Sequence, residues 1–249
     1  MTTIFISPSL QHNNRGIGDY GTEAQRMRYI GERVRELLLQ RGLTETSISD
    51  PTDSLMEAIQ LSNAINADVH VAIHSNAGGG RGTEVFYPSG KVQGKRLATA
   101  LYERVSPLFP DSNRATPIKP NFTYKELKEV YAEATALIEV GFHDSPQDAR
   151  IIIDKAELIA QRICDGICDY LGVPTHAPQI TIVYNGNTFQ PKDPVELEDG
   201  VIYLSLSDAG EMVLNTRTLP LRKVMEYLGK DVVWDGNTST VYIDDREEG

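Results

Sequence analysis

The sequence predicts an α/β fold, in which a mostly parallel twisted sheet carries helices on both faces, followed by a small α+β C-terminal domain. Over the first ~170 residues, short apolar runs alternate with amphipathic helical stretches, which is typical of a parallel sheet covered on both sides. A short segment with two prolines then interrupts this pattern, and closely spaced strand and turn signals follow it. We therefore expect a first domain over residues 1–172, a linker over 173–178 and a second domain over 179–249.

The elements of the first domain follow from the spacing of apolar residues. Ile4-Phe5-Ile6 is a short apolar run before Pro8 and indicates a buried strand. A helix is expected from Thr22 to Arg41, with Thr22 as its N-cap and Gly42 as its stop signal. Further strands are expected over residues 44–49, 69–73, 83–87 and 136–140, and further helices over 54–65, 91–108 and 144–171.

The second domain shows hairpin signals. The alternating run over residues 180–184 leads into Asn185-Gly186, a dipeptide typical of two-residue hairpin turns. A strand is expected over 201–204, a helix over 220–228, and a closing hairpin from the runs 232–234 and 240–243.

Composition excludes several classes of protein. The formal net charge of −11 over 249 residues disfavours nucleic-acid binding. The chain holds no apolar run of about 18 residues, so we expect no membrane insertion. The first residues lack a basic and an apolar region, so a secretory signal is not expected and the protein is predicted to be cytoplasmic when made. Cys164 and Cys168 are expected to be buried, unlinked residues.

Four residues could form one catalytic metal site: His12, Glu23, His74 and Glu139. Each stands where a strand-like run ends or a helix-like run begins, and ligands of such sheets bind beyond the carboxyl ends of the strands. Two histidines and one carboxylate are a common catalytic zinc set that leaves a position open for water, and a further carboxylate can act as general base. The pattern therefore points to metal-assisted hydrolysis.

Glu139 is the most informative of the four because it interrupts the apolar run that ends in Gly141-Phe142. A glutamate at such a position needs a partner. The partner could be a metal-bound water, which would make Glu139 a general base, or it could be Arg15 or Arg81 in a buried ion pair. His70, which lies within a strand-like run, is interpreted as a core residue.

With these residues the chain resembles the zinc-dependent N-acetylmuramoyl-L-alanine amidases of the type-3 amidase family. The resemblance covers residues 1 to about 172. Its motifs are His12, Glu23, His74-Ser75-Asn76-Ala77, the glycine-rich stretch Gly78 to Gly82, and Glu139-Val140-Gly141-Phe142. It implies that His12, Glu23 and His74 bind Zn²⁺, that Glu139 is the catalytic base, and that bacterial peptidoglycan is the substrate. The family usually begins with Asp-Pro-Gly-His-Gly-Gly, whereas this chain has Ser7-Pro8-Ser9 with His12 three residues later.

The second domain resembles the copper-amine-oxidase N-terminal-like modules, on the segments 219–229, 233–238 and 241–243. Such modules are common accessory domains of bacterial wall proteins, and the resemblance implies no copper site. Cell-wall attachment is the role that it favours, and a structural role or homo-oligomer formation is the alternative.

Two other classes of function remain open. A zinc carboxypeptidase-like exopeptidase would need a cation for a free carboxylate, which Arg81 or Arg114 could supply. A non-catalytic wall-binding protein with a structural metal would need a fourth ligand, for which His143 is the candidate. Asn76 is expected either to orient a ligand or substrate group or to cap a turn. For an amidase without a secretory signal, a phage endolysin released with the help of a holin is favoured over a host enzyme freed when a mother cell lyses.

Overall fold

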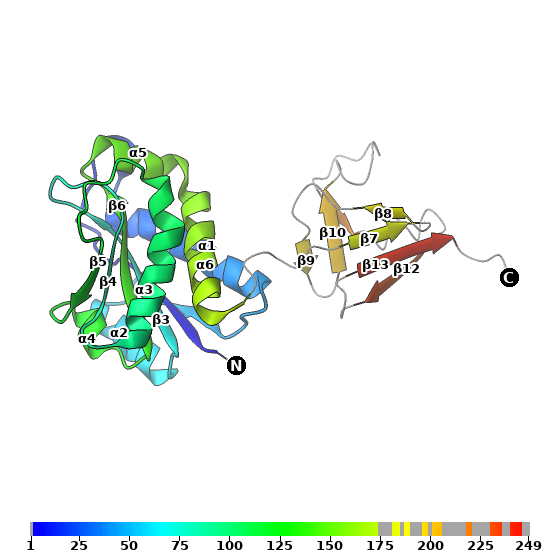
Figure 1. Cartoon of the computed structure of the whole chain (residues 1–249), viewed down its shortest axis with the longest axis horizontal. Coiled ribbons are helices and arrows are strands. Elements are labelled where there is room, and N and C mark those ends of the chain that lie inside the picture. The colour runs from blue at the N-terminus through cyan, green and yellow to red at the C-terminus, as the bar shows by residue number, and fades with distance from the viewer. Residues whose placement is uncertain are drawn as a thin grey trace. The chain divides into compact units, whose positions relative to one another are not determined.

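The computed structural model describes residues 2–173 and the backbone of seven strands beyond them (Figure 1). The chain divides into two compact units, residues 1–175 and 176–249.

A six-stranded sheet in the order β2-β1-β3-β6-β4-β5 forms the centre of the first unit. All neighbouring strands run parallel except β4 and β6, which are antiparallel. The predicted mostly parallel α/β fold is therefore confirmed. The strands are β1 (Ile4–Pro8), β2 (Thr46–Ile48), β3 (Val69–Asn76), β4 (Glu84–Pro88), β5 (Ile118–Asn121) and β6 (Ala134–Phe142).

The helices begin and end close to the predicted signals. Thr22 caps the first long helix with a complete capping box, and Gly42 follows it with a φ of 78°, a conformation that glycine adopts without strain. Ser54 caps the next helix in the same way. The helices are α1 (Glu23–Gln40), α2 (Leu55–Ala64), α3 (Val92–Val105), α4 (Lys125–Glu129), α5 (Pro146–Asp154) and α6 (Ala156–Leu171), with short 3-10 turns η1 (Gly18–Tyr20) and η2 (Ser106–Leu108).

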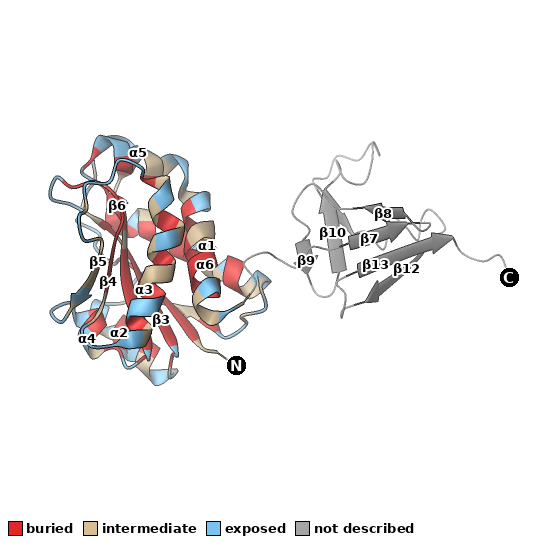
Figure 2. Cartoon of the chain, in the orientation of Figure 1, coloured by how far each residue is buried: buried red, intermediate tan, exposed pale blue. Residues whose placement is uncertain are grey.

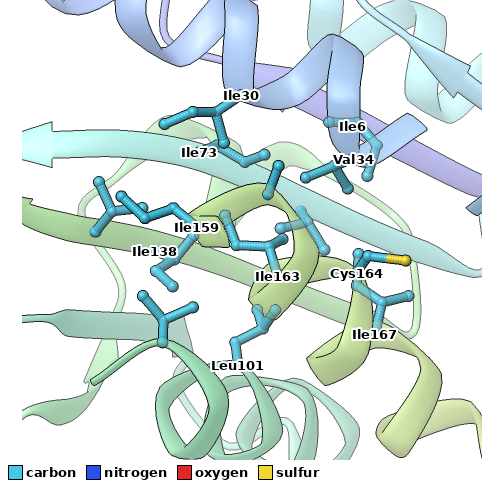
Figure 3. Packing of buried hydrophobic residues seen from close by; sticks show 14 of the residues in the cluster. Ile6, Ile30, Val34, Ile73, Leu101, Ile138, Ile159, Ile163, Cys164 and Ile167 are labelled. Carbon is cyan, nitrogen blue, oxygen red and sulfur yellow. The ribbon is translucent and has the colours of Figure 1, made fainter. Parts of the chain in front are cut away.

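The two faces of the sheet are covered unequally. Helices α1, α3 and α6 pack on one face and enclose the main apolar core, seen in Figure 3 between Ile30, Ile73 and Ile163. The short helices α2 and α4 cover the other face with two smaller apolar clusters. Figure 2 shows the result, a largely buried sheet and helices that are exposed on their outer sides. Both cysteines are buried and unlinked, as predicted.

Side-chain alternation along β3 assigns the polar residues to the thinly covered face. Val69, Val71 and Ile73 belong to the main core, so the residues between them point to the opposite side. His70 and His74 therefore face the side of α2 and α4, where space remains for a site. The predicted burial of His70 is confirmed.

Two elements of the first unit were not predicted, β5 and α4. Strand β5 holds the sequence Ile-Lys-Pro-Asn, and α4 holds Lys-Glu-Leu-Lys-Glu. Neither segment is long enough to show a clear hydrophobic period. The antiparallel β4 was also not distinguished from the parallel strands, because direction depends on pairing with β6 rather than on composition.

The second unit contains two sheets, β11-β10-β9 and β12-β13-β7-β8. The predicted first hairpin is confirmed, because β7 and β8 pair antiparallel with Tyr184 opposite Asn187. The closing hairpin β12–β13 is confirmed as well. The predicted helix over 220–228 lies outside the described residues after position 220, and the linker over 173–178 does so after 173. The strands are β7 (Thr181–Tyr184), β8 (Asn187–Phe189), β9 (Glu196–Glu198), β10 (Val201–Ser205), β11 (Thr218–Pro220), β12 (Lys230–Asp235) and β13 (Thr240–Asp245).

Candidate active site

A pocket of about 590 Å³ opens at the carboxyl ends of β1, β3 and β6, a size common for small-molecule sites. His74 and Glu139 line it and are direct neighbours across the parallel pair β3–β6. The pocket also has apolar walls, to which Leu10, Leu55 and Leu137 contribute. Two of the four predicted site residues are thus neighbours in one pocket.

Glu23 reaches His74 from the first turn of α1. His74 Nδ1 donates a hydrogen bond to Glu23 Oε1 over 2.8 Å. Asn14 Nδ2 donates to the other oxygen, Glu23 Oε2, over 2.6 Å. Burial by itself would raise the pKa of Glu23, but the hydrogen bond and charge of His74 lower it below its usual value. Glu23 is therefore held as a carboxylate beside the imidazole.

The ring of His74 lies between the carboxyl groups of Glu23 and Glu126. Its Nε2 lies 3.7 Å from Glu126 Oε2, while its Nδ1 bonds to Glu23. Burial by itself would lower the pKa of His74, but the nearby carboxylate of Glu126, the hydrogen bond to Glu23 and the charge of Glu139 raise it to about 10. Two carboxylates thus fix the orientation of the ring. With a metal at Nδ1, Glu126 at Nε2 would be the carboxylate partner that metal-binding histidines usually have.

Glu126 is a site residue that the sequence did not reveal. It is buried in the first turn of α4, and its Oε1 accepts hydrogen bonds from Ser7 Oγ and from His70 Nε2. His70 Nδ1 bonds in turn to Ser62 Oγ over 2.9 Å. In the sequence Glu126 belongs to a short charged stretch that is typical of a solvated helix. The only sequence signal was indirect, since a buried His70 requires a polar partner.

Glu139 differs from Glu23, Glu84 and Glu126 because, within residues 2–173, no salt bridge joins its carboxyl group to a cationic side chain. Its Oε2 is buried and has no hydrogen-bond partner among the described residues. Burial raises the pKa of Glu139 to about 7, and the charges of Glu23 and Glu84 add to this while His74 opposes it. The predicted alternative of an ion pair with Arg15 or Arg81 is not seen among the described residues. A carboxyl with a pKa near neutrality is suited to exchange protons at neutral pH.

Asn76 ends β3 and holds a neighbouring carboxylate. Its Nδ2 donates to Glu84 Oε2 over 3.0 Å, and Lys119 and Arg114 also lie at the carboxyl group of Glu84. Asn76 therefore orients an acidic side chain, and its own side-chain oxygen accepts from the backbone of Ala77. The predicted role of Asn76 in capping a turn is thus confirmed, whereas its role in orienting a ligand or substrate group stays a prediction.

The structure places His12 on an exposed turn. Within residues 2–173 no hydrogen bond joins its side chain to Glu23 or His74, whereas the preceding residue, Gln11, lies at both. Within the same residues, no three His, Cys, Asp or Glu side chains meet in a metal-binding arrangement. The role of His12 as a ligand stays a prediction.

The residues named for the alternative functions lie elsewhere. His143 is buried, and its Nδ1 bonds to Ser75 Oγ rather than to Glu23 or His74. Arg81 forms an ion pair with Asp111 over 2.8 Å, and Arg114 lies 3.7 Å from Glu84. Both arginines are therefore close to acids of the chain itself. Within the described part of the chain, no helix is both long and apolar enough to cross a membrane.

A comparison with known proteins identifies the family of the chain. The family model of N-acetylmuramoyl-L-alanine amidases matches residues 4–169, which hold the whole first sheet and all four candidate residues. The chain therefore belongs to the N-acetylmuramoyl-L-alanine amidase family.

Individual relatives show the same extent of similarity. The N-acetylmuramoyl-L-alanine amidase CwlM of Bacillus licheniformis is 27% identical over 172 residues, which are 67% of this chain and 66% of that protein. Among solved structures, the amidase AmiC2 of Nostoc punctiforme has a TM-score of 0.60 at 21% identity, over 69% of this chain and 97% of that one. The catalytic domain of the amidase CwlV from Bacillus (Paenibacillus) polymyxa var. colistinus has a TM-score of 0.60 at 22% identity, covering 70% and 100%. These two structures share the fold of the first unit.

Proposed function

We propose that this protein is a zinc-dependent peptidoglycan hydrolase that cleaves the amide bond between N-acetylmuramic acid and the L-alanine of the stem peptide. The observation that carries the proposal is Glu139, which lies beside His74 in a pocket of about 590 Å³ and whose buried Oε2 has no hydrogen-bond partner among the described residues. Membership of the amidase family supports the choice of bond and substrate.

The residues present fit a zinc ion. Glu23 and His74 bring an oxygen and a nitrogen to within 2.8 Å of each other in a mostly buried place, and both are ligand types that zinc prefers. The buried Glu139 Oε2 has no other described partner, as expected of a group that faces a reacting water. When bound, zinc would polarise the scissile carbonyl and lower the pKa of the attacking water.

The side chains of the chain supply the other parts of the reaction. Glu139 accepts the proton of the attacking water at its carboxylate and later donates it to the leaving amine. Because its pKa of about 7 is close to neutral pH, Glu139 can both accept and donate a proton there at a small cost in free energy. Glu126 orients His74 from the far side of the ring, and Asn14 fixes the carboxylate of Glu23.

The activity is tested on purified cell walls. An amidase releases new N-terminal L-alanine without new reducing sugar ends, whereas a glycosidase releases reducing ends and an exopeptidase releases free amino acids. The full chain with zinc should produce only the first kind of product, and Glu139→Gln should not. Release of free amino acids without new N-terminal alanine would favour the carboxypeptidase-like alternative instead.

We also propose that the second unit attaches the enzyme to the wall. Support comes from its separate compact fold and from its resemblance to wall-associated modules. Tethering to an insoluble polymer raises the effective concentration of substrate. Residues 1–175 alone should therefore cleave soluble muropeptides as well as the full chain does, but should pellet less with whole walls. Equal pelleting of both would assign the second unit to stability or oligomer formation, which size-exclusion chromatography of the two proteins would distinguish.

The same activity suits a phage endolysin that reaches the wall after a holin opens the membrane. Expression in the cytoplasm of a sensitive host should then be harmless until the membrane is permeabilised, and lysis should follow at once. Culture turbidity before and after permeabilisation measures this, and lysis without permeabilisation would contradict the proposal.

A further inference from the structure

The position beside Glu23 and His74 that the sequence assigned to His12 is taken by Gln11. Gln11 Nε2 lies 3.4 Å from Glu23 Oε1 and 3.5 Å from His74 Nδ1. The remaining side of this triangle, from His74 Nδ1 to Glu23 Oε1, is 2.8 Å. Three polar side-chain atoms from β3, α1 and the loop after β1 thus lie within hydrogen-bond reach of one another.

The triangle has the dimensions of one face of a tetrahedral zinc site. Ligand atoms that lie about 2.1 Å from a tetrahedral zinc are about 3.4 Å from one another. Both sides that include Gln11 match this separation. The third side is shorter because His74 and Glu23 share a hydrogen bond, which the metal would replace.

A carboxamide can turn either of its ends toward the site. A half-turn of the terminal bond of Gln11 exchanges its nitrogen for its oxygen at nearly the same place, and the oxygen has free lone pairs. An amide oxygen is a weaker zinc ligand than an imidazole nitrogen, since zinc prefers N and S donors. A site with Gln11 would therefore bind zinc less tightly than one with two histidines.

The turn after β1 places Gln11 beside Glu23 and His74. Gln11 N donates to Ser9 Oγ, and Asn14 N donates to Gln11 O over 3.2 Å. These bonds fix a tight turn in which Gln11 and His12 are both exposed residues, and the side chain of Gln11 is the one that contacts Glu23 and His74. Asn14, at the end of the turn, bonds to Glu23 Oε2 and so leaves Oε1 facing Gln11.

We propose that Gln11, through its side-chain oxygen, is the third protein ligand of the metal together with Glu23 and His74, in place of the neighbouring His12. This rests on the proposed zinc-dependent function. It gives a site with one imidazole, one carboxylate and one amide, and leaves the fourth position open for water.

The direct test is zinc K-edge X-ray absorption of the full chain loaded with one equivalent of zinc. Scattering from the imidazole ring counts the histidine ligands, and the proposal requires one. A count of two imidazoles would overturn it. Absence of any stoichiometric zinc binding would instead contradict the proposed zinc-dependent function, so the two failures are distinct. This test needs no variant and does not depend on how a variant folds.

Variants of the two adjacent residues provide matched controls for one another. Gln11→Ala should weaken zinc binding at least about 10-fold in a competition titration, while His12→Ala should leave the affinity within about twofold. Gln11→His should tighten zinc binding and raise the imidazole count to two. If His12→Ala weakens binding and Gln11→Ala does not, His12 is the ligand and the proposal is wrong. Circular dichroism of the metal-free variants checks that each has folded.

Discussion

Two glutamates face each other across strands β4 and β6, and they have opposite surroundings. Glu84 and Glu139 are direct partners in the antiparallel register. Glu84 is paired with Lys119 and Arg114 and accepts a hydrogen bond from Asn76. The Oε2 of Glu139 is buried with no described partner, and burial raises its pKa to about 7. Glu84 on β4 thus stabilises the structure, whereas Glu139 on β6 is available for proton transfer.

The difference arises from the cations of the edge of the sheet. Lys119 lies on β5, which pairs only with β4 in the first unit, so it reaches Glu84 rather than Glu139. Within residues 2–173, Glu139 therefore forms no salt bridge, and the charge of His74 lowers its pKa only in part. The carboxylate of Glu84 is thus held in ion pairs with the chain's own cations, whereas the carboxyl of Glu139 remains available to the substrate and the metal.

Removal of the metal should have the largest effect on this contrast. A strong chelator should abolish amidase activity, and added Zn²⁺ should restore it. The proposed reaction at Glu139 requires the ion, whereas the ion pairs of Glu84 do not. Release of N-terminal L-alanine from walls measures the activity. Unfolding in urea should show that the metal-free protein, with its Glu84 ion pairs, is still folded. Full activity in a metal-free sample would exclude the metal-hydrolase mechanism.

Glu139→Gln should lower turnover by about 10²-fold or more, the usual contribution of a general base, and should leave zinc content unchanged. Glu84→Gln is the matched control, because it makes the same change in the facing position and should alter turnover far less. The measurement is the turnover of each variant on one soluble muropeptide. Equal losses in both variants would show that the facing glutamates do not have separate roles.

The stability of the metal-free protein should depend on pH through Glu139. Its pKa is about 7 in the folded protein against 4.5 ordinarily. The folded state therefore holds the proton more tightly, so the stability present below the ordinary pKa is lost as pH rises toward 7, by at most roughly 3 kcal/mol. Urea unfolding of the wild type and Glu139→Gln across this range measures the difference. An unchanged difference between the two proteins at both ends of the range would contradict the raised pKa.

Lys119→Met should destabilise the fold by about 1–2 kcal/mol, because it removes a half-exposed cation from the buried carboxylate of Glu84. The remaining contacts with Arg114 and Asn76 limit the loss. Urea unfolding at neutral pH gives the value. Lys125→Met, on the rim of the pocket, is a control of the same type. A loss in the control as large as in Lys119→Met would mean that the ion pair contributes little.

Local sequence was sufficient where a pattern is carried by neighbouring residues. Thr22 and Gly42 marked the ends of α1, and the apolar runs before His74 and Glu139 marked the ends of β3 and β6. The proximity of the latter two residues also followed, because parallel strands end at one edge of a sheet. The zinc ligand set stays a prediction, since within residues 2–173 no hydrogen bond joins the side chain of His12 to Glu23 or His74.

The sequence by itself determined the α/β class, the strand ends that carry His74 and Glu139, and the helix start that carries Glu23. Only the tertiary structure decided which groups surround them. Glu126 reaches His74 from a five-residue helix that shows no period of its own. Gln11, the residue before the predicted His12, is the one that contacts Glu23 and His74, from the turn after β1. Such contacts join residues far apart in the chain through loops and short elements, whose directions depend on packing rather than on local propensity.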